Sequence, residues 1–188
     1  LKSSDNRERA MNYADRFWQL VRKRTIMLSG HIDGDKQEDI TLAIVLLNGE
    51  SDDPIKFLLD SEGGSANHSL LICDAIVHSK AVVDGLIMGK AHSGAFIISQ
   101  AFKRRIAYPH ATFLIHGPSL DGLRSDQKNL IAMINFRKHI HQKMLDTMAL
   151  RSGQPMKKLR AWSKAECYFD AEEALRLNFI DEIIQSLQ

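Results

Sequence analysis

A serine and a histidine follow two successive strand-like runs, and both side chains are of types that carry out acyl transfer. Ser93 lies between a strand-like run that ends near Met88 and a helix-like run, and His116 ends the next strand-like run. A serine at a helix start has backbone amides and the positive end of the helix dipole beside it, which stabilise a developing oxyanion. A histidine held at a strand end can act as its general base. The pair therefore predicts a serine hydrolase.

Each of these residues also has a structural interpretation. Serine is a favoured N-cap, so Ser93 could simply begin a helix. Its neighbours Ala91 and Ala95 do not form a Gly-x-Ser-x-Gly elbow. Taken alone, a histidine such as His116 is more often a hydrogen-bonded core residue than a general base. The residue types by themselves leave both interpretations open.

Paired glycines, Gly63 and Gly64, follow another strand-like run and precede a helix-like run. Glycines let the backbone turn tightly and bring its amides close to a ligand, although Gly-Gly also suits a simple strand-to-helix turn. The glycine pair, Ser93 and His116 each come at the downstream end of a strand, where α/β sheets gather their ligand sites. This shared placement favours one common site.

Strand-like and helix-like runs alternate along the chain, which predicts an α/β fold with largely parallel strands. The clearest helix covers about 125–151, ends before Gly153 and Pro155, and is long enough to project and pack between subunits. We divide the chain into an N-terminal helical extension, 1–24, and one domain, 25–188. Strands are expected at 25–28, 55–60, 82–88, 112–115 and 179–184, and further helices around 40–47, 66–79, 93–102, 156–162 and 171–177.

The composition is that of a soluble globular protein and disfavours several classes of function. Of the 188 residues, 44% are hydrophobic and 26% charged, and the net charge of +2 is too small to imply nucleic acid as the main partner. The basic clusters at 22–24 and 103–105 lack interleaved aromatics, so we expect solvated surface charge there. No apolar run approaches the roughly 20 residues that span a bilayer, and no apolar signal core opens the chain, which predicts a cytoplasmic protein.

Neither metal chemistry nor a cofactor is indicated. Cys73 and Cys167 lie far apart and are expected to be reduced, structural thiols. His139 and His141 are two apart on the long helix, so they point to different sides and make a poor ligand pair. There is no His-Glu-x-x-His motif and no phosphate loop. We therefore expect no metal site and no cofactor.

Five segments in order resemble the proteolytic subunit of Clp protease. They are Ser-Glu-Gly-Gly-Ser at 61–65, Met-Gly-Lys-Ala-His-Ser-Gly-Ala-Phe at 88–96, Ile-His-Gly-Pro at 115–118, Ser-Gly-Gln-Pro at 152–155, and Ala-Glu-Glu-Ala-Leu-x-Leu-Asn-Phe-Ile-Asp at 171–181. The resemblance implies the crotonase-like ClpP fold of stacked βαβ units, with the long helix as a protruding handle. It also implies a serine endopeptidase that self-associates into heptamers or tetradecamers, acts on peptides or unfolded proteins, and is served by an AAA+ unfoldase.

Carried over by position, the resemblance makes Ser93 the nucleophile and His116 the general base. Gly64 and Gly94 would donate their amides to the oxyanion. Ser93 would attack the peptide carbonyl, His116 would move the proton, and water would release the acyl-enzyme.

Three departures from the family pattern stand out. The segment after the nucleophile is one residue short, so counting from the helix side places His92 at the nucleophile position instead of Ser93. The position of the triad aspartate holds Trp162, and the third member is then Glu166, Asp170 or absent. The N-terminus has a charged, aromatic helix where the family has a short axial loop, which puts coupling to an unfoldase in question.

Two main functions compete on these residues. The first is a ClpP-like serine endopeptidase with an atypical triad, whose activity is reduced or lost because of Trp162. The alternative is a non-catalytic, ClpR-like ring subunit of a mixed Clp complex. A crotonase-type enzyme acting on acyl thioesters is less well supported, because that chemistry has no use for the serine and histidine.

Overall fold

The computed structural model describes residues 13–118 and 127–184. The helix expected over 1–24 is helical at α1 (Tyr13–Val21), and its first twelve residues lie outside the described part. Two of its core-facing residues, Phe17 and Val21, are buried against the domain. The first two residues expected in the long helix, 125 and 126, also lie outside the described part.

A seven-stranded sheet forms the centre of the described domain. Its main order is β1-β2-β3-β4-β7, and β5 pairs with the far part of β3 and then with β6. All of these pairings are parallel apart from β5 with β6, which confirms the expected largely parallel α/β fold. The strands are β1 (Thr25–Ile32), β2 (Ile55–Gly64), β3 (Val83–His92), β4 (Arg105–Ala107), β5 (Thr112–Ile115), β6 (Cys167–Asp170) and β7 (Glu182–Ile183).

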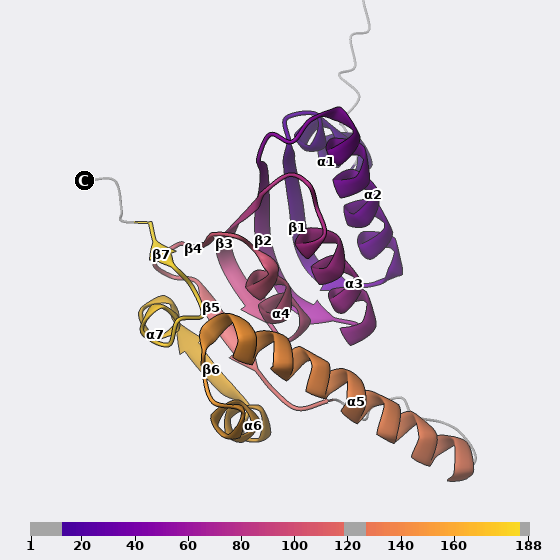
Figure 1. Cartoon of the computed structure of the whole chain (residues 1–188), viewed down its shortest axis with the longest axis vertical. Helices are drawn as coiled ribbons and strands as arrows, with labels where there is room; N and C mark the ends of the chain where they lie inside the picture. The colour runs from indigo at the N-terminus through magenta and orange to yellow at the C-terminus, as the bar shows by residue number, and fades with distance from the viewer. Residues whose placement is uncertain (1–12, 119–126, 185–188) are drawn as a thin grey trace, which may run out of the picture.

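Crossover helices cover the sheet, as the right-handed connection of parallel strands requires. Figure 1 shows α2, α3 and α4 packed side by side against it. The short α4 is almost entirely buried and forms the centre of the core, together with a cluster of phenylalanines. The helices after α1 are α2 (Gly34–Glu50), α3 (Ala66–Val77), α4 (Gly94–Ala101), α5 (Gln127–Ser152), α6 (Met156–Ala165) and α7 (Ala171–Arg176).

Helix α5 is the protruding handle that the sequence predicts. Its C-terminal part packs into the core through Met144, Leu145 and Met148, whereas Ile131 and Phe136 in its N-terminal half are more than half exposed. Figure 1 shows this half extending away from the body of the molecule. The helix ends where expected, since Gly153 follows it with a φ of +72°.

Several local expectations are wrong or incomplete. The strands β4 and β6 were not predicted, because each has only three or four residues and depends on pairing partners distant in sequence. The terminal strand is shorter than expected. The basic clusters are not simply surface charge: Arg105 is 3% exposed, and Arg24 donates to the carbonyls of Leu47, Ser51 and Asp53.

Both cysteines are free thiols, and Cys73 is buried. Burial raises the pKa of the Cys73 thiol, which suits a structural rather than a reactive group. Across residues 13–118 and 127–184, no helix is long and apolar enough to cross a bilayer.

Candidate active site

Ser93 stands at a sharp turn between β3 and α4. Its φ of 54° and ψ of −120° match the first central position of a type II′ turn, where glycine is normally found. Ser93 makes no side-chain cap hydrogen bond to α4, so the N-cap interpretation does not describe it. Its Oγ instead lies 2.7 Å from Nε2 of His116. The backbone at this turn is held by the Ser93 amide, which donates to the carbonyl of Leu114 on β5.

The glycine pair brings the end of β2 directly against this turn. Gly63 has a φ of +92°, and a Cβ there would lie 2.8 Å from Cβ of Ser93 and 2.9 Å from the backbone nitrogen of Gly94. A Cβ at Gly64 would lie 2.2 Å from the carbonyl oxygen of Ile32 on β1. Only glycine fits at either position, because any side chain would overlap backbone atoms. The two glycines therefore allow β1, β2 and the Ser93 turn to meet.

The backbone nitrogens of Gly64 and Gly94 come close together beside Ser93. A Cβ built on Gly94 would lie 3.7 Å from the Gly64 nitrogen. Gly94 begins α4, where the first backbone amides of a helix have no partner within the helix. The resemblance implies that both glycines donate to one oxyanion, and the structure places them next to each other.

A cleft of about 610 Å³ opens over Ser93 and His116. Its lining comes from the carboxyl ends of β1, β2, β3 and β5 and from one side of α5. The cleft therefore lies where an open parallel sheet gathers ligand groups. Residues that line it include His31, Gly64, Asn67, Ser93, His116, Phe136, Arg137, Ile140 and His141.

His92, the alternative nucleophile, lies away from this pair. It is the last residue of β3, and its Nε2 lies 2.9 Å from Oγ1 of Thr112. Its ring also meets that of Tyr168 edge-on. Burial, reinforced by the nearby charge of Lys90, lowers the pKa of His92. The His92 side chain therefore contacts residues of β5 and β6, whereas the Ser93 side chain contacts His116.

Trp162, at the position of the expected triad aspartate, faces the hydrophobic core. Its ring packs edge-on against Phe169 and Phe179, and Nζ of Lys158 lies 4.6 Å from the ring centre. The next residue, Ser163, lies on a different side of α6, since successive helical residues are turned by about 100°. Its hydroxyl lies 2.9 Å from Nε2 of His141 on α5.

The two carboxylates named as substitutes for the triad aspartate are placed very differently. Asp170 caps α7 by accepting from the Glu173 amide, and it pairs with Thr112 at the far end of β5 from His116. Glu166 ends α6 in a left-handed conformation and lines the same hollow as His116. Within the described residues, no carboxylate is hydrogen-bonded to His116.

His141 is a neighbour of His116 that the sequence pattern does not indicate. The pattern suggests only a poor metal-ligand pair with His139, and among the described residues no metal-binding cluster is found. His141 instead lies near His116 and bonds to Ser163. Burial, and then the nearby His116, lowers the pKa of His141. Only the tertiary structure brings these two residues together, because they are 25 positions apart in the sequence.

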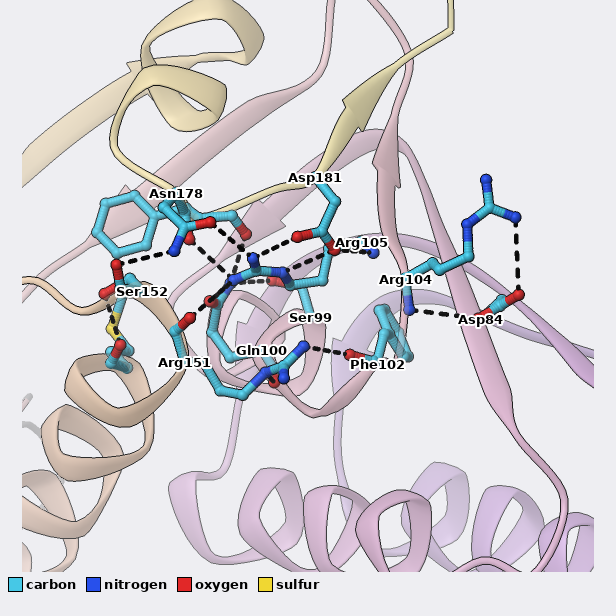
Figure 2. A network of polar contacts seen from close by, with 12 residues as sticks. Asp84, Ser99, Gln100, Phe102, Arg104, Arg105, Arg151, Ser152, Asn178 and Asp181 are labelled. Atoms are coloured by element: carbon cyan, nitrogen blue, oxygen red, sulfur yellow. Dashed lines mark hydrogen bonds and ion pairs between the residues drawn. The ribbon is translucent and has the colours of Figure 1, made fainter.

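A buried polar network fixes helix α4, which follows Ser93, to the end of the handle (Figure 2). Arg105 donates to Gln100 of α4, to Asn178 and to Asp181. Arg151, near the end of α5, donates to the carbonyls of Gln100 and Phe102. Because both arginines donate to residues at the C-terminal end of α4, the network helps to set the position of the helix that follows Ser93.

Comparisons with known proteins agree with this geometry. The model of the Clp protease family matches residues 7–187. The chain is 30% identical over 180 residues to ATP-dependent Clp protease proteolytic subunit 2 of Rhodococcus jostii, covering 93% of this chain and 91% of the relative. It is 29% identical to the protein of the same description from Nocardia farcinica, covering 93% of this chain and 87% of the relative.

A solved structure shows the same fold. A mutant of ClpP1 from Listeria monocytogenes superposes with a TM-score of 0.81 at 22% identity, covering 91% of this chain and 96% of that one. This likeness confirms the expected ClpP-like fold of stacked βαβ units with a handle helix. The match of the family model over almost the whole chain shows that this protein belongs to the Clp protease family.

Proposed function

We propose that this chain is a ClpP-like serine endopeptidase that works with an atypical triad. The observation that carries the proposal is the 2.7 Å contact between Ser93 Oγ and His116 Nε2 at a strained turn above a cleft. A serine is a weak nucleophile unless an adjacent base removes its proton, and this contact supplies that base. The strained turn presents the hydroxyl to the cleft rather than to the backbone of α4.

The chemical steps follow from the placement of these groups. Ser93 Oγ donates its proton to His116 Nε2 and attacks the peptide carbonyl, and the Gly64 and Gly94 amides donate to the oxyanion that forms. His116 then passes the proton to the leaving amine as the peptide bond breaks. Water, deprotonated by His116, releases the acyl group from Ser93.

We also propose that the protein assembles with copies of itself and with a partner. We expect self-association into heptameric or tetradecameric rings, with peptides or unfolded proteins as substrates and an AAA+ unfoldase as a partner. The relatives described as ATP-dependent Clp protease proteolytic subunits support an energy-dependent partner. Apolar side chains on the outer face of α2 support self-association. The domain division at residue 24 and the cytoplasmic location remain predictions.

A fluorophosphonate probe tests the catalytic assignment. We expect one covalent adduct on the wild-type protein by intact mass, located on Ser93 by peptide mapping. Ser93→Ala should abolish the adduct and His116→Ala should slow it by about a thousandfold, since loss of a triad member typically removes most of the rate. Ser51→Ala is the control, because Ser51 follows α2 and does not line the cleft.

Trp162 favours a second candidate, a non-catalytic ClpR-like subunit of a mixed ring. A missing third member typically costs about four orders of magnitude in turnover. Wild-type protein that assembles but takes no adduct, under conditions that label an active serine peptidase, would support this candidate and contradict the first. An adduct that persists in Ser93→Ala would contradict the assignment of the nucleophile instead.

A further inference from the structure

His116 separates two hollows, and only one of them contains Ser93. The first is the cleft already described. The second has a volume of about 530 Å³ and lies between the C-terminal part of α5 and helix α6, with His116 and His141 in its wall. Ser163, which bonds to His141, lines it too. We call this second space the α5–α6 hollow.

The charge around the α5–α6 hollow is mainly positive. Lys138 on α5 and Arg160 and Lys164 on α6 line it, against the single carboxylate of Glu166. Arg160 is oriented by its hydrogen bond to the side chain of Gln142, at 2.8 Å. None of these three cations has an ion pair with a described carboxylate. Both histidines add positive charge whenever they are protonated.

Among the described residues, His116 in the wall of this hollow has a hydrogen-bond partner on only one of its two ring nitrogens. Trp162 is packed into the phenylalanine cluster and brings no polar atom to the histidine. Nε2 of His116 is engaged by Ser93, so an orienting acceptor has to meet the other ring nitrogen. An imidazolium formed during acyl transfer is stabilised most strongly by an anion at that position.

We propose that the α5–α6 hollow is a binding site for a carboxylate that does not come from the described part of this chain's own fold. The carboxylate accepts from His116, and Lys138, Arg160 and Lys164 hold its charge. Its source is either a free small carboxylate or an acidic side chain of an associated protein chain. The inference rests on the proposed function for its catalytic consequence, but binding itself can be measured without catalysis.

Binding is tested on the Ser93→Ala protein by diethyl pyrocarbonate, which reacts with neutral imidazole. Peptide mapping gives the modification rate of each histidine against pH, with sodium acetate replacing sodium chloride at constant ionic strength. A bound carboxylate favours the protonated imidazole. Acetate should therefore raise the pH at which modification of His116 and His141 is half-maximal by about half a pH unit or more, and the rise should saturate with acetate concentration. The midpoint of exposed His110 should not move. Equal midpoints in acetate and chloride overturn the site.

Two charge variants locate the site. Arg160→Gln should raise about tenfold the acetate concentration that produces half of the effect on His116, because the variant removes a cation of the hollow. Lys103→Gln is the matched control, since it removes one exposed charge outside the hollow and should leave the acetate effect unchanged. An acetate effect that persists equally in both variants contradicts the assignment to this hollow.

The catalytic consequence is measured on the wild-type protein as the rate of fluorophosphonate labelling of Ser93. Acetate at saturation should accelerate labelling about tenfold or more, because it restores part of the missing triad member. If an associated chain supplies the carboxylate, labelling in chloride should instead rise with protein concentration and the acetate effect should vanish at high concentration. Both results support the proposal and distinguish the two sources.

A direct role of Glu166 as the carboxylate that orients His116 would contradict the proposal. If wild-type labelling is fast in chloride at every protein concentration, is insensitive to acetate and falls in Glu166→Gln, then this chain's own Glu166 serves His116 and the proposal is wrong. If acetate raises the histidine midpoints but Ser93 is never labelled, the carboxylate site stands and the proposed peptidase function fails. The two failures are therefore distinguishable.

Discussion

At the scale of single residues, the backbone of Ser93 is strained, and the strained turn places the Ser93 hydroxyl beside His116. A non-glycine residue in this region of φ and ψ is strained by about 1–3 kcal/mol. The strain is maintained by neighbours on two strands and one helix, through Gly63 of β2, Gly94 of α4 and the bond to the Leu114 carbonyl of β5. A position that tolerates glycine best but holds serine is more consistent with use of the hydroxyl than with capping.

Replacing Ser93 by glycine should therefore stabilise the fold relative to replacing it by alanine. Both variants remove the hydroxyl, but only glycine relieves the positive φ, so Ser93→Gly should be about 1 kcal/mol more stable than Ser93→Ala. Urea unfolding of the two proteins at one pH and concentration measures the difference. Equal midpoints would show that the turn is not strained in the folded protein.

His141 should make the protein less stable as the pH falls. Its pKa in the folded state lies below the unfolded value of about 6.5, so the unfolded chain binds more protons in this range. The stabilising contribution is complete above that value and is lost as the pH falls through the folded pKa. His92 acts in the same direction.

Urea unfolding between pH 7.5 and pH 5 should show a smaller loss of stability for His141→Gln than for the wild-type protein. His110→Gln, at an exposed position, is the control and should follow the wild-type curve. A His141→Gln curve parallel to the wild type would mean that His141 titrates alike in the folded and unfolded states.

At the scale of elements, one buried arginine fastens three segments to the end of α4. Arg105 on β4 bonds to Gln100, Asn178 and Asp181, and Arg151 on α5 bonds to the adjacent carbonyls (Figure 2). Burial tends to raise the pKa of Asp181, but its bonds to Arg105 outweigh this and lower it. The ion pair therefore persists to acid pH.

Removal of the Asp181 carboxylate should destabilise the protein, because Arg105 would remain buried with less compensation. We expect Asp181→Ala to cost about 2 kcal/mol, below the usual value for a fully buried pair since Asp181 is 40% exposed. Arg104→Ala is the matched control: Arg104 pairs with Asp84 and Glu182 at the surface and should cost less than about 0.5 kcal/mol. Similar losses in both, from urea unfolding, would contradict the distinction.

At the scale of the whole molecule, helix α2 is apolar on two opposite sides. Ile40, Ala43, Ile44 and Leu47 face the core, whereas Leu42, Val45 and Leu46 recur on the outer side with 45%, 64% and 47% exposure. A surface helix normally has a polar outer face. An apolar stripe left in water is typical of a surface that another protein chain covers.

A charge in this stripe should therefore prevent self-association. Val45→Glu is expected to shift the mass from light scattering from an assembly to the monomer at micromolar concentration, because an unpaired charge would be buried at the contact. Lys157→Glu, a charge reversal at an exposed position of α6, is the control and should leave the assembly intact. Wild-type protein that is already monomeric would argue against a ring.

The sequence by itself determined the order of the longer elements and the residues that could do chemistry. Strand and helix periodicity depend on local burial patterns, so the α/β class, the long helix with its stop at Gly153, and the cap at Asp170 were predictable. Ser93, His116 and the glycine pair were also predictable, because a parallel sheet brings strand ends together.

Tertiary structure alone decided which partners these residues meet. That Ser93 contacts His116 while His92 contacts Thr112 depends on the sense of the turn after β3, since neighbouring residues at a strand end face opposite sides. The burial of Arg105, the approach of His141 to His116 and the inward orientation of Trp162 all depend on contacts between segments far apart in sequence. Local propensity carries no information about such contacts, because they arise only when the helices pack on the completed sheet.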